Sequence, residues 1–285
     1  MSVERQILRY HGSKWKLARQ LVIPNMPKHK VYVEPFGGGG NVLLRKDRVA
    51  AEIYNDLDGR VVNVFRCLQN LEKAEAIKRR LSLTPFARAE FDSCYEPATD
   101  DVDDACKTIM LSFMGHGTDA ITRSCRTGFR VKMTDSRATP AAPWATYYEA
   151  IDSFVERLRG VVVECRDATE VMLRTDSKGT VFYVDPPYVS STRSSVTGRS
   201  GATHGYQHEM TDEDHRSLAV VLRELRGMVM LSGYPSKIYD ELYGGWDQLR
   251  FDSLADGAKE RVECLWFNKA AWAKRPQMQL IRMIA

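Results

Sequence analysis

The sequence predicts an α/β protein built on a doubly wound, mainly parallel sheet. From Val31 onward, short apolar runs typical of buried strands alternate with segments of helical periodicity. The first strand, helix and strand form a βαβ unit, which implies parallel strands joined by a right-handed crossover. Turns rich in glycine or proline follow two of the strands, at the edge where open α/β sheets bind ligands.

The amino-terminal part of the chain supplies the first of these units. Val31–Glu34 is a short strand that must stop at Pro35, because proline cannot donate to a strand ladder. The segment from Asp58 to Leu68 has helical periodicity, with Val61, Val62, Phe65 and Leu68 on one face. The elements expected here are a helix from near Trp15, a strand at Val31–Glu34, a turn at Phe36–Gly40, a helix at Asn41–Lys46, a strand at Ala50–Tyr54 and a helix at Asp58–Leu68.

The middle of the chain interrupts this alternation. Residues 71–117 are mostly helical in pattern, and residues 118–143 have no sustained periodicity but are rich in Lys and Arg. The helices expected are Leu71–Leu81, Pro85–Tyr95, Val102–Met114 and Trp144–Leu158. We therefore expect a mostly helical, basic insertion at 71–159 within a domain formed by residues 1–70 and 160–285.

After the insertion the alternation of strands and helices returns. The elements expected are strands at Val161–Cys165 and Val181–Val184, a helix from about Thr211 to Leu225, a strand at Met228–Ser232 and a late strand at Val262–Phe267 with a hairpin partner at Leu249–Phe251. Thr211 and Asp214 have the spacing of a weak capping box at the start of their helix.

Composition narrows the classes of function. The 285 residues are 44% hydrophobic and 27% charged, as in a globular protein large enough to bury a full core. The formal charge of +4 permits a polyanionic partner without requiring one. Because no apolar stretch approaches a membrane span and the first ten residues lack a signal-peptide core, we expect no membrane partner. Six scattered cysteines, without metal-ligand spacing, favour reduced thiols in a cytoplasm and no bound metal.

Asp185-Pro186-Pro187-Tyr188 is the most informative segment. It follows the apolar run 181–184, and its two prolines end the strand. The result is a rigid turn that presents a carboxylate, fixed carbonyls and an aromatic ring at the carboxyl edge of the sheet. These groups suit a planar base with an exocyclic amino group. For the tetrapeptide alone, an ordinary strand-ending turn is the alternative.

The glycine-rich segment Glu34 to Gly40 lies where the first strand meets its helix. Glycines let the backbone adopt positive φ and approach a ligand closely, and the following helix N-terminus favours an anionic group. The spacing is neither G-x-G-x-x-G nor that of a P-loop, so neither a dinucleotide nor a nucleoside triphosphate fingerprint applies. A loose connection is the alternative.

Two acids and an upstream segment complete a predicted nucleoside site. Asp56 follows the second strand, where a carboxylate can accept from both ribose hydroxyls. Asp167 follows the strand 161–165 and is placed to accept from an adenine amino group. For both acids, a helix cap is the alternative. The segment 10–14 offers an aromatic ring, a flexible turn and a lysine that can reach a cofactor carboxylate, although alone it is also typical of a capped surface helix.

Four motifs in this order resemble the Dam-type DNA adenine-N6 methyltransferases, the alpha group or D12 class. They are Tyr-x-Gly-Ser-Lys at 10–14, Glu-Pro-Phe-x-Gly-x-Gly at 34–40, Asn-Asp at 55–56 and Asp-Pro-Pro-Tyr at 185–188. Leu-Ser-Gly-Tyr at 231–234 and Glu-x-Leu-Trp-Phe-Asn at 263–268 are similar to the tail of the same pattern. The resemblance covers most of the chain outside roughly residues 70–160. It implies a Rossmann-like methyltransferase sheet in which the insertion is the target-recognition region.

The resemblance implies S-adenosylmethionine as the methyl donor. Asp185, Pro186, Pro187 and Tyr188 would form the base pocket. The cofactor-binding residues expected from the motifs and the resemblance are Tyr10, Gly12, Lys14, Glu34, Pro35, Phe36, Gly38, Gly40, Asp56, Asp167 and Asp185. Two departures stand out. Ala168 occupies a position where family members often have Phe, and the insertion lacks the family's Gly-Phe-Asn segment apart from a faint match at 127–130, which argues against assuming the target GATC.

The expected reaction is methylation of N6 of adenine in double-stranded DNA. Because the N6 lone pair is delocalised into the ring, the nitrogen is a poor nucleophile. Asp185 and the Pro186 carbonyl would each accept an N6 hydrogen, and Tyr188 would stack on the base. Transfer would be a direct displacement that depends on positioning and electrostatics, without a metal or covalent enzyme intermediate. The base must be flipped out of the duplex to be reached.

DNA contacts are expected from the insertion and from the loop after the base pocket. The candidates are Arg123, Arg126, Arg130, Lys132 and Arg193. Each can contact phosphate or read guanine, and a solvated basic loop is the alternative. The loop 190–205 could close over the flipped base. We expect a cytoplasmic, nucleoid-associated enzyme of bacterial or phage type, acting as a monomer or homodimer.

Three other functions remain open at this point. N4-cytosine methylation in DNA uses the same amino-group chemistry, although Asp185 favours adenine and a serine there would have favoured cytosine. An RNA adenine-N6 methyltransferase is equally compatible with a basic insertion. A catalytically inactive fold that only binds DNA is the non-enzyme alternative, against which the intact cofactor and pocket motifs count.

Overall fold

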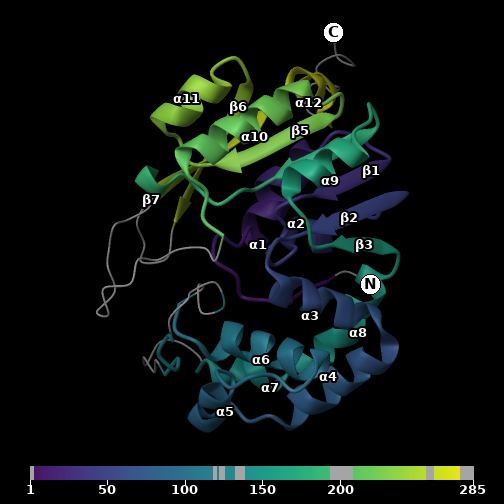
Figure 1. The fold of residues 1–285 in the computed structure, drawn as a ribbon, viewed down its shortest axis with the longest axis vertical. Helices are drawn as coiled ribbons and strands as arrows, with labels where there is room; N and C mark the ends of the chain where they lie inside the picture. Colours follow the sequence, from purple (N-terminus) through teal and green to yellow (C-terminus); the bar gives the residue numbers. More distant parts are fainter. Residues whose placement is uncertain are drawn as a thin grey trace.

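The computed structural model describes residues 3–117, 121, 126–131, 139–192, 208–254 and 260–276. Within these residues the centre of the molecule is a seven-stranded sheet with helices on both faces (Figure 1). The strands are β1 (Val31–Glu34), β2 (Ala51–Asn55), β3 (Val161–Glu164), β4 (Thr180–Val184), β5 (Met228–Gly233), β6 (Asp247–Leu254) and β7 (Glu260–Phe267).

The strand order is β3-β2-β1-β4-β5-β7-β6. Strands β1 to β5 are parallel, whereas β7 is antiparallel to β5 and forms a hairpin with β6. The chain moves outward from β1 to β3 and then returns to place β4 on the other side of β1. The carboxyl ends of β1 and β4 therefore flank the topological switch point, where open sheets bind ligands. The predicted doubly wound, mainly parallel sheet and its late hairpin are confirmed.

One face of the sheet is covered by three helices. Alternate strand residues such as Val33 and Phe182 point to this face, as the two-residue period of a strand requires. The helices are α9 (Ala168–Thr175), α10 (Asp212–Glu224) and α11 (Lys237–Tyr243). The predicted capping box at the start of α10 is present, since Thr211 and Asp214 bond reciprocally.

The opposite face packs against the remaining helices. Tyr32 and Tyr183 of adjacent strands point to this side and join a second apolar cluster. Near the sheet the helical elements are α1 (Trp15–Leu17), a π-helical turn (Ala18–Val22), a 3-10 turn (Ile23–Asn25), α2 (Asn41–Arg45), α3 (Gly59–Gln69) and α12 (Lys269–Lys274). The single helix expected from near Trp15 is thus divided into three helical types.

The middle of the chain forms a helical group at one end of the molecule (Figure 1). Its helices are α4 (Leu71–Leu83), α5 (Arg88–Ser93), α6 (Asp101–Met114), α7 (Ala141–Ala145) and α8 (Ile151–Leu158). They share one apolar cluster with α3 and the sheet. In addition, Arg157 of α8 forms a buried ion pair with Glu52 of β2, with 2.7 Å between Nη1 and Oε2. The division into a catalytic domain and an insertion stays a prediction.

The helix expected over Trp144–Leu158 is broken in the structure, and that prediction was wrong. Helix α7 ends at Ala145, and a 3-10 turn at Tyr147–Ala150 precedes α8. The rings of Trp144 and Tyr147 stack at 5.7 Å, and the Tyr147 hydroxyl donates to the Ile7 carbonyl at 2.6 Å. The amino-terminal segment and the aromatic stack therefore hold a conformation that a continuous helix would not provide.

Candidate active site

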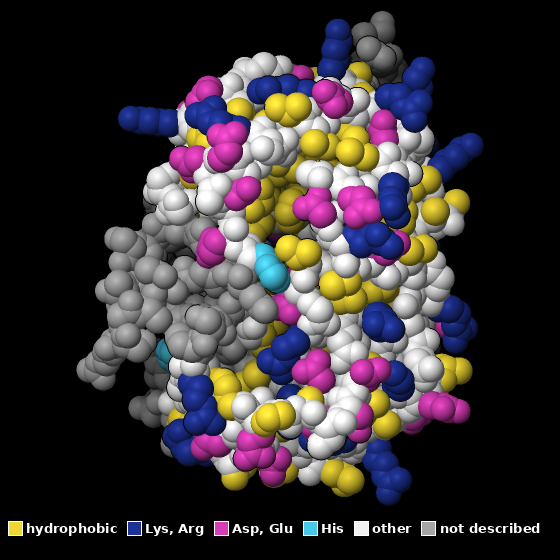
Figure 2. All heavy atoms as spheres, viewed as in Figure 1, with side chains coloured by type: hydrophobic (Ala, Val, Ile, Leu, Met, Phe, Trp, Pro, Cys, Tyr) yellow, Lys and Arg dark blue, Asp and Glu magenta, His cyan; other side chains and the backbone are white. Residues whose placement is uncertain are grey.

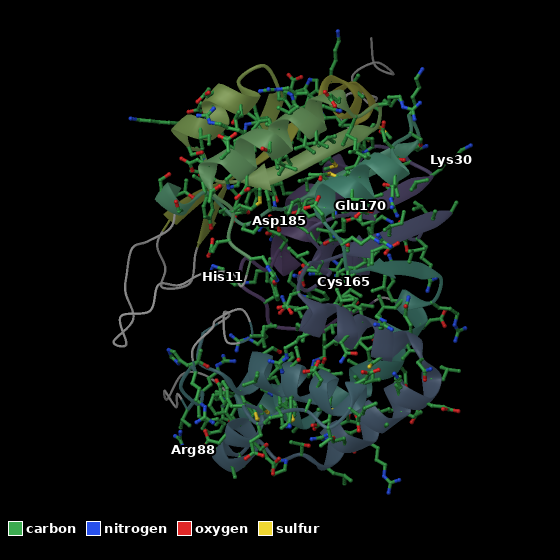
Figure 3. The ribbon with its side chains drawn as sticks, viewed as in Figure 1. His11, Lys30, Arg88, Cys165, Glu170 and Asp185 are labelled. Atoms are coloured by element: carbon green, nitrogen blue, oxygen red, sulfur yellow. The ribbon has the colours of Figure 1, made fainter. Side chains whose placement is uncertain are left out.

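A pocket of about 420 Å³ opens at the carboxyl ends of the parallel strands, beside the switch point. Its walls come from the segment 10–14, the turn after β1, the starts of α3 and α9, the turn after β4 and the segment 208–218. Figure 3 shows Asp185 and His11 toward this edge, whereas Lys30 lies at the opposite end of the sheet. The face of the molecule seen in Figure 2 is hollowed near its centre, and apolar side chains lie in the hollow.

The glycine turn forms one wall of this pocket. Gly38 and Gly40 have φ of +48° and +61°, which side chains of L residues rarely adopt. A Cβ added to Gly38 would lie 2.8 Å from the ring of Tyr10, so the tyrosine packs directly on bare backbone. The Tyr54 hydroxyl donates to the Gly38 carbonyl at 2.6 Å and holds the turn from behind. Glycine is therefore required here for the conformation and for the close approach.

Asp56 is bound to the same turn. Its Oδ2 accepts from the Gly38 N–H at 2.7 Å, and its Oδ1 accepts from the Asp58 N–H at 2.9 Å. Loss of solvation raises the pKa of Asp56 to about 6, against the opposing effect of these two donors. The cap of α3 is Asp58, whose Oδ1 accepts from the Arg60 N–H at 2.9 Å. The helix-cap alternative for Asp56 is thus taken by its neighbour.

Asn55 holds two of the site-forming loops together. Its Nδ2 donates to the carbonyls of Pro35 and Arg166 at 2.9 and 3.0 Å, and its Oδ1 accepts from the Arg166 N–H at 2.9 Å. One buried amide therefore connects the turn after β1 to the turn after β3. Asn55 was absent from the predicted site residues, although it belongs to the Asn-Asp motif.

Asp167 caps a helix and also lines the pocket. It is the cap of α9, since its Oδ1 accepts from the Thr169 and Glu170 N–H groups at 2.9 and 3.3 Å. It also lines the pocket beside Ala168. The cap is confirmed, and contact with an adenine amino group stays a prediction.

Lys14 and Asp185 form an ion pair in the wall of the pocket. Lys14 Nζ lies 3.1 Å from Asp185 Oδ2, donates to the Gly12 carbonyl at 2.8 Å and lies 4.7 Å from the centre of the Tyr188 ring. The Ser232 hydroxyl donates to Asp185 Oδ1 at 2.6 Å. Lys14 is 5% exposed and the Asp185 side chain 18%. The lysine expected at a cofactor carboxylate thus contacts the carboxylate of the proline turn.

Tyr188 is fixed on the far side of that turn. Its hydroxyl donates to Glu263 Oε2 at 2.9 Å, and its ring meets the Tyr234 ring edge-on at 4.6 Å. Burial raises the pKa of Glu263, while Lys14 and the tyrosine hydroxyls act in the opposite direction. Pro186 and Tyr188 are buried, whereas Asp185 and Pro187 line the pocket.

Glu34 connects β1 to the helix that follows the glycine turn. Its Oε2 accepts from the Tyr32 hydroxyl at 2.8 Å and from the Leu43 N–H at 2.9 Å. Burial raises the pKa of Glu34 to about 8. Nearby, Asn41 lines the pocket, and its buried Oδ1 has no hydrogen-bond partner among the described residues.

Most of the predicted cofactor residues are brought together in this pocket. Those that line it are Tyr10, Gly12, Lys14, Glu34, Pro35, Phe36, Gly38, Asp56, Asp167 and Asp185. Gly40 does not line the pocket and is the N-cap residue of α2. The sequence reasoning did not single out the lining residues His11, Asn41, Leu57, His208 and Met210, nor the supporting residues Ser232 and Glu263. Ser232 and Glu263 occur in motifs at 231–234 and 263–268, which was the available signal.

The predicted DNA-contacting residues are only partly described. The Arg126 guanidinium lies 4.4 Å from the centre of the Tyr95 ring, and its Nη2 donates to the Asp92 carbonyl at 3.3 Å. The backbone of Arg130 pairs with Met114 at 2.7 Å. Arg123, Lys132, Arg193 and nearly all of the loop 190–205 lie outside the described residues.

Two features are absent from the described part of the chain. No cluster of three or more His, Cys, Asp or Glu side chains is arranged there to hold a metal ion. No helix there combines the length and the apolar character needed to cross a membrane.

Comparison with known proteins places this site in a family. A model of the D12 class N6 adenine-specific DNA methyltransferases matches residues 10–252. The DNA adenine methylase of Salmonella typhi is 26% identical over 255 residues, which cover 85% of each protein. That of Escherichia coli (strain K12) is 24% identical over 254 residues with the same coverage. The type II methyltransferase M.MjaIII of Methanocaldococcus jannaschii is 23% identical over 271 residues, 85% of this chain and 89% of that protein. The chain belongs to the D12 class of N6 adenine-specific DNA methyltransferases.

Proposed function

We propose that the protein transfers a methyl group from S-adenosylmethionine to N6 of an adenine flipped out of double-stranded DNA, at a defined sequence. Membership of the family establishes adenine-specific methylation of DNA. The donor, the flipped base, the duplex substrate and the roles of individual residues are the proposal. The observation that carries it is the Asp185 carboxylate, which Lys14 and Ser232 hold between the pocket and the Tyr188 ring.

The pocket fits S-adenosylmethionine by its chemistry. When bound, this donor supplies an electrophilic methyl group on a positively charged sulfur. Asp56 offers carboxylate oxygens at the position where ribose hydroxyls are held in related folds. Gly38 leaves a cradle that a Cβ would fill, and Asn41 presents a buried acceptor without a partner among the described residues. We infer that these three residues hold the ribose and the amino-acid end of the donor.

The base site is built by the proline turn. Asp185 and the Pro186 carbonyl each accept a hydrogen bond from N6. These two bonds direct the nitrogen lone pair toward the methyl group. The Tyr188 ring stacks on the base, and the duplex must release the base before these contacts can form. Lys14 offsets the cost of placing the Asp185 carboxylate away from solvent. Rate enhancement then comes from fixed orientation and fixed charges.

One experiment with two measurements tests this proposal. Isothermal titration with S-adenosylmethionine measures donor binding, and unmethylated genomic DNA is then incubated with protein and donor and sequenced with detection of modified bases. We expect donor binding and N6-methyladenine at one sequence motif. Methylcytosine at N4, or modification of RNA alone, would contradict the assignment of the substrate. A protein that binds DNA but not the donor would be an inactive binding module.

A further inference from the structure

Glu263 is an acid in an otherwise apolar stretch of β7. The segment Val262 to Phe267 contains no other charged residue, and Glu263 is 7% exposed. Strand β7 pairs with β5 so that Gly233 lies opposite Cys264. The Glu263 side chain therefore lies next to the end of β5, at the edge of the sheet that also holds the proline turn.

The carboxylate is contacted by two tyrosines, Tyr188 of the proline turn and Tyr234 of the turn after β5. Tyr188 donates its hydroxyl to Oε2 at 2.9 Å, and the Tyr234 side chain is a second hydrogen-bond partner. The two rings touch edge-on with their centres 4.6 Å apart. One carboxylate thus connects a tyrosine of the proline turn to a tyrosine of the turn after β5.

Keeping an acid at this position has a cost. Burial raises the pKa of Glu263, since the charged form loses its hydration. A buried carboxylate is retained at such a position only when hydrogen-bond donors meet it, and an apolar residue would pack in a strand more simply. The donors here are the hydroxyls of aromatic rings whose orientation the base site requires.

We propose that Glu263 is a positioning residue for methyl transfer, which holds the hydroxyls of Tyr188 and Tyr234 and thereby sets the plane against which the extruded adenine stacks. This inference rests on the proposed function of Tyr188. Glu263 does not touch the base or the donor itself. Its effect reaches the reaction through the orientation of one ring.

The test is a double-mutant cycle between Glu263→Gln and Tyr188→Phe. Glu263→Gln keeps the shape of the side chain, and Tyr188→Phe keeps the ring but removes the hydroxyl. Each single variant should lower kcat by about tenfold, as expected for loss of a hydrogen bond to a charged group. The KM for S-adenosylmethionine should stay within the error of the native protein, whereas the unfolding midpoint should fall in both variants because each disturbs a buried hydrogen bond. Tyr188→Phe removes the hydrogen bond, and Glu263→Gln removes the charge of its acceptor. Because both changes act on the same bond, the double variant should be no slower than the slower single variant.

Glu156→Gln is the matched control, because Glu156 is an exposed carboxylate of α8 that pairs with Arg159 and lines neither the donor pocket nor the cavity beside Tyr234. Its kcat should equal that of the native protein. Single-variant losses that multiply in the double variant would overturn the inference, as would an unchanged kcat in Glu263→Gln. A fall in unfolding midpoint with kcat intact would show that Glu263 supports only the fold. Failure of the native protein to bind the donor or methylate adenine would instead contradict the proposed function.

Discussion

By the catalytic edge we mean the edge of the sheet that carries the proline turn at 185–188. This edge and the helical group formed by the middle of the chain each place a cation over a tyrosine ring. The surroundings of the two cations differ. Lys14 is 5% exposed and has a carboxylate, a carbonyl and the Tyr188 ring as neighbours. Arg126 is exposed, with the Tyr95 ring and one carbonyl beside it. A cation over a ring contributes about 0.5–1 kcal/mol when exposed and about 2 when desolvated. We therefore expect the buried pair to matter for methyl transfer and the exposed arginine to remain free to bind phosphate.

The largest expected effect is at the catalytic edge, with Asp185→Asn. The variant keeps the shape of the side chain but loses the charge that pairs with Lys14 and that we propose accepts a hydrogen bond from N6. We expect kcat to fall by about 10²- to 10³-fold, the cost of removing one preorganised electrostatic contact. Donor affinity measured by calorimetry should be retained. Asp152→Asn, at an exposed position on α8, is the control. Near-native turnover of Asp185→Asn would contradict the assigned role of Asp185.

The next effect is on donor binding, through Gly38→Ala. The change places a Cβ at φ +48° and 2.8 Å from the Tyr10 ring, so the turn or the ring must move. We expect the dissociation constant for S-adenosylmethionine to rise about tenfold, consistent with a strain of about 1–2 kcal/mol. Gly59→Ala is the matched control, because a Cβ there meets nothing within 4 Å. Equal affinities in the two variants would show that the turn does not contact the donor.

A smaller effect is expected on the insertion, with Arg126→Ala. Loss of one phosphate contact should raise the KM for DNA by about two- to fivefold and leave kcat unchanged. The slope of the logarithm of the binding constant against the logarithm of the salt concentration should become smaller by about one. Lys30→Ala is the control, since Lys30 lies at the opposite end of the sheet (Figure 3). A change in the methylated sequence, with little change in salt dependence, would assign Arg126 to base readout instead.

The smallest effect concerns stability and pH, through Glu34→Gln. The pKa of Glu34 is about 8 in the folded protein and near 4.5 when unfolded, so the folded state binds the extra proton between these values. Its contribution to stability is therefore complete below pH 4.5 and is lost as the pH rises through 8. The unfolding midpoint of the native protein, measured by calorimetry, should fall relative to that of Glu34→Gln as the pH rises from about 5 to 8. Parallel curves would show that Glu34 is ionised throughout.

The sheet and the proline turn could be predicted because they follow from local patterns. Short apolar runs that end before Pro35 and Pro186 define β1 and β4, and the wall residues follow directly after them in the chain. The sequence motifs also led to the family that the comparison confirmed.

The supports of the site could not be predicted in the same way. Ser232 meets Asp185 across 47 residues, and Glu263 meets Tyr188 across 75. The antiparallel pairing of β7 with β5 brings Glu263 to this edge, and that pairing joins segments that are far apart in the chain. The break at Thr146 has the same origin, since it depends on contacts with Ile7 and neighbouring residues far away in the chain.

The antiparallel direction of β7 also has a consequence for biosynthesis. The parallel strands place residues at their carboxyl ends on the catalytic edge. Strand β7 runs in the opposite direction and places Glu263, from its first half, on the same edge. Translation passes the glycine turn and the proline turn well before it reaches residue 263, so the nascent chain holds both turns while Tyr188 still lacks its acceptor. Because domains fold as units once their elements are present, the edge is completed only after the last hairpin has left the ribosome.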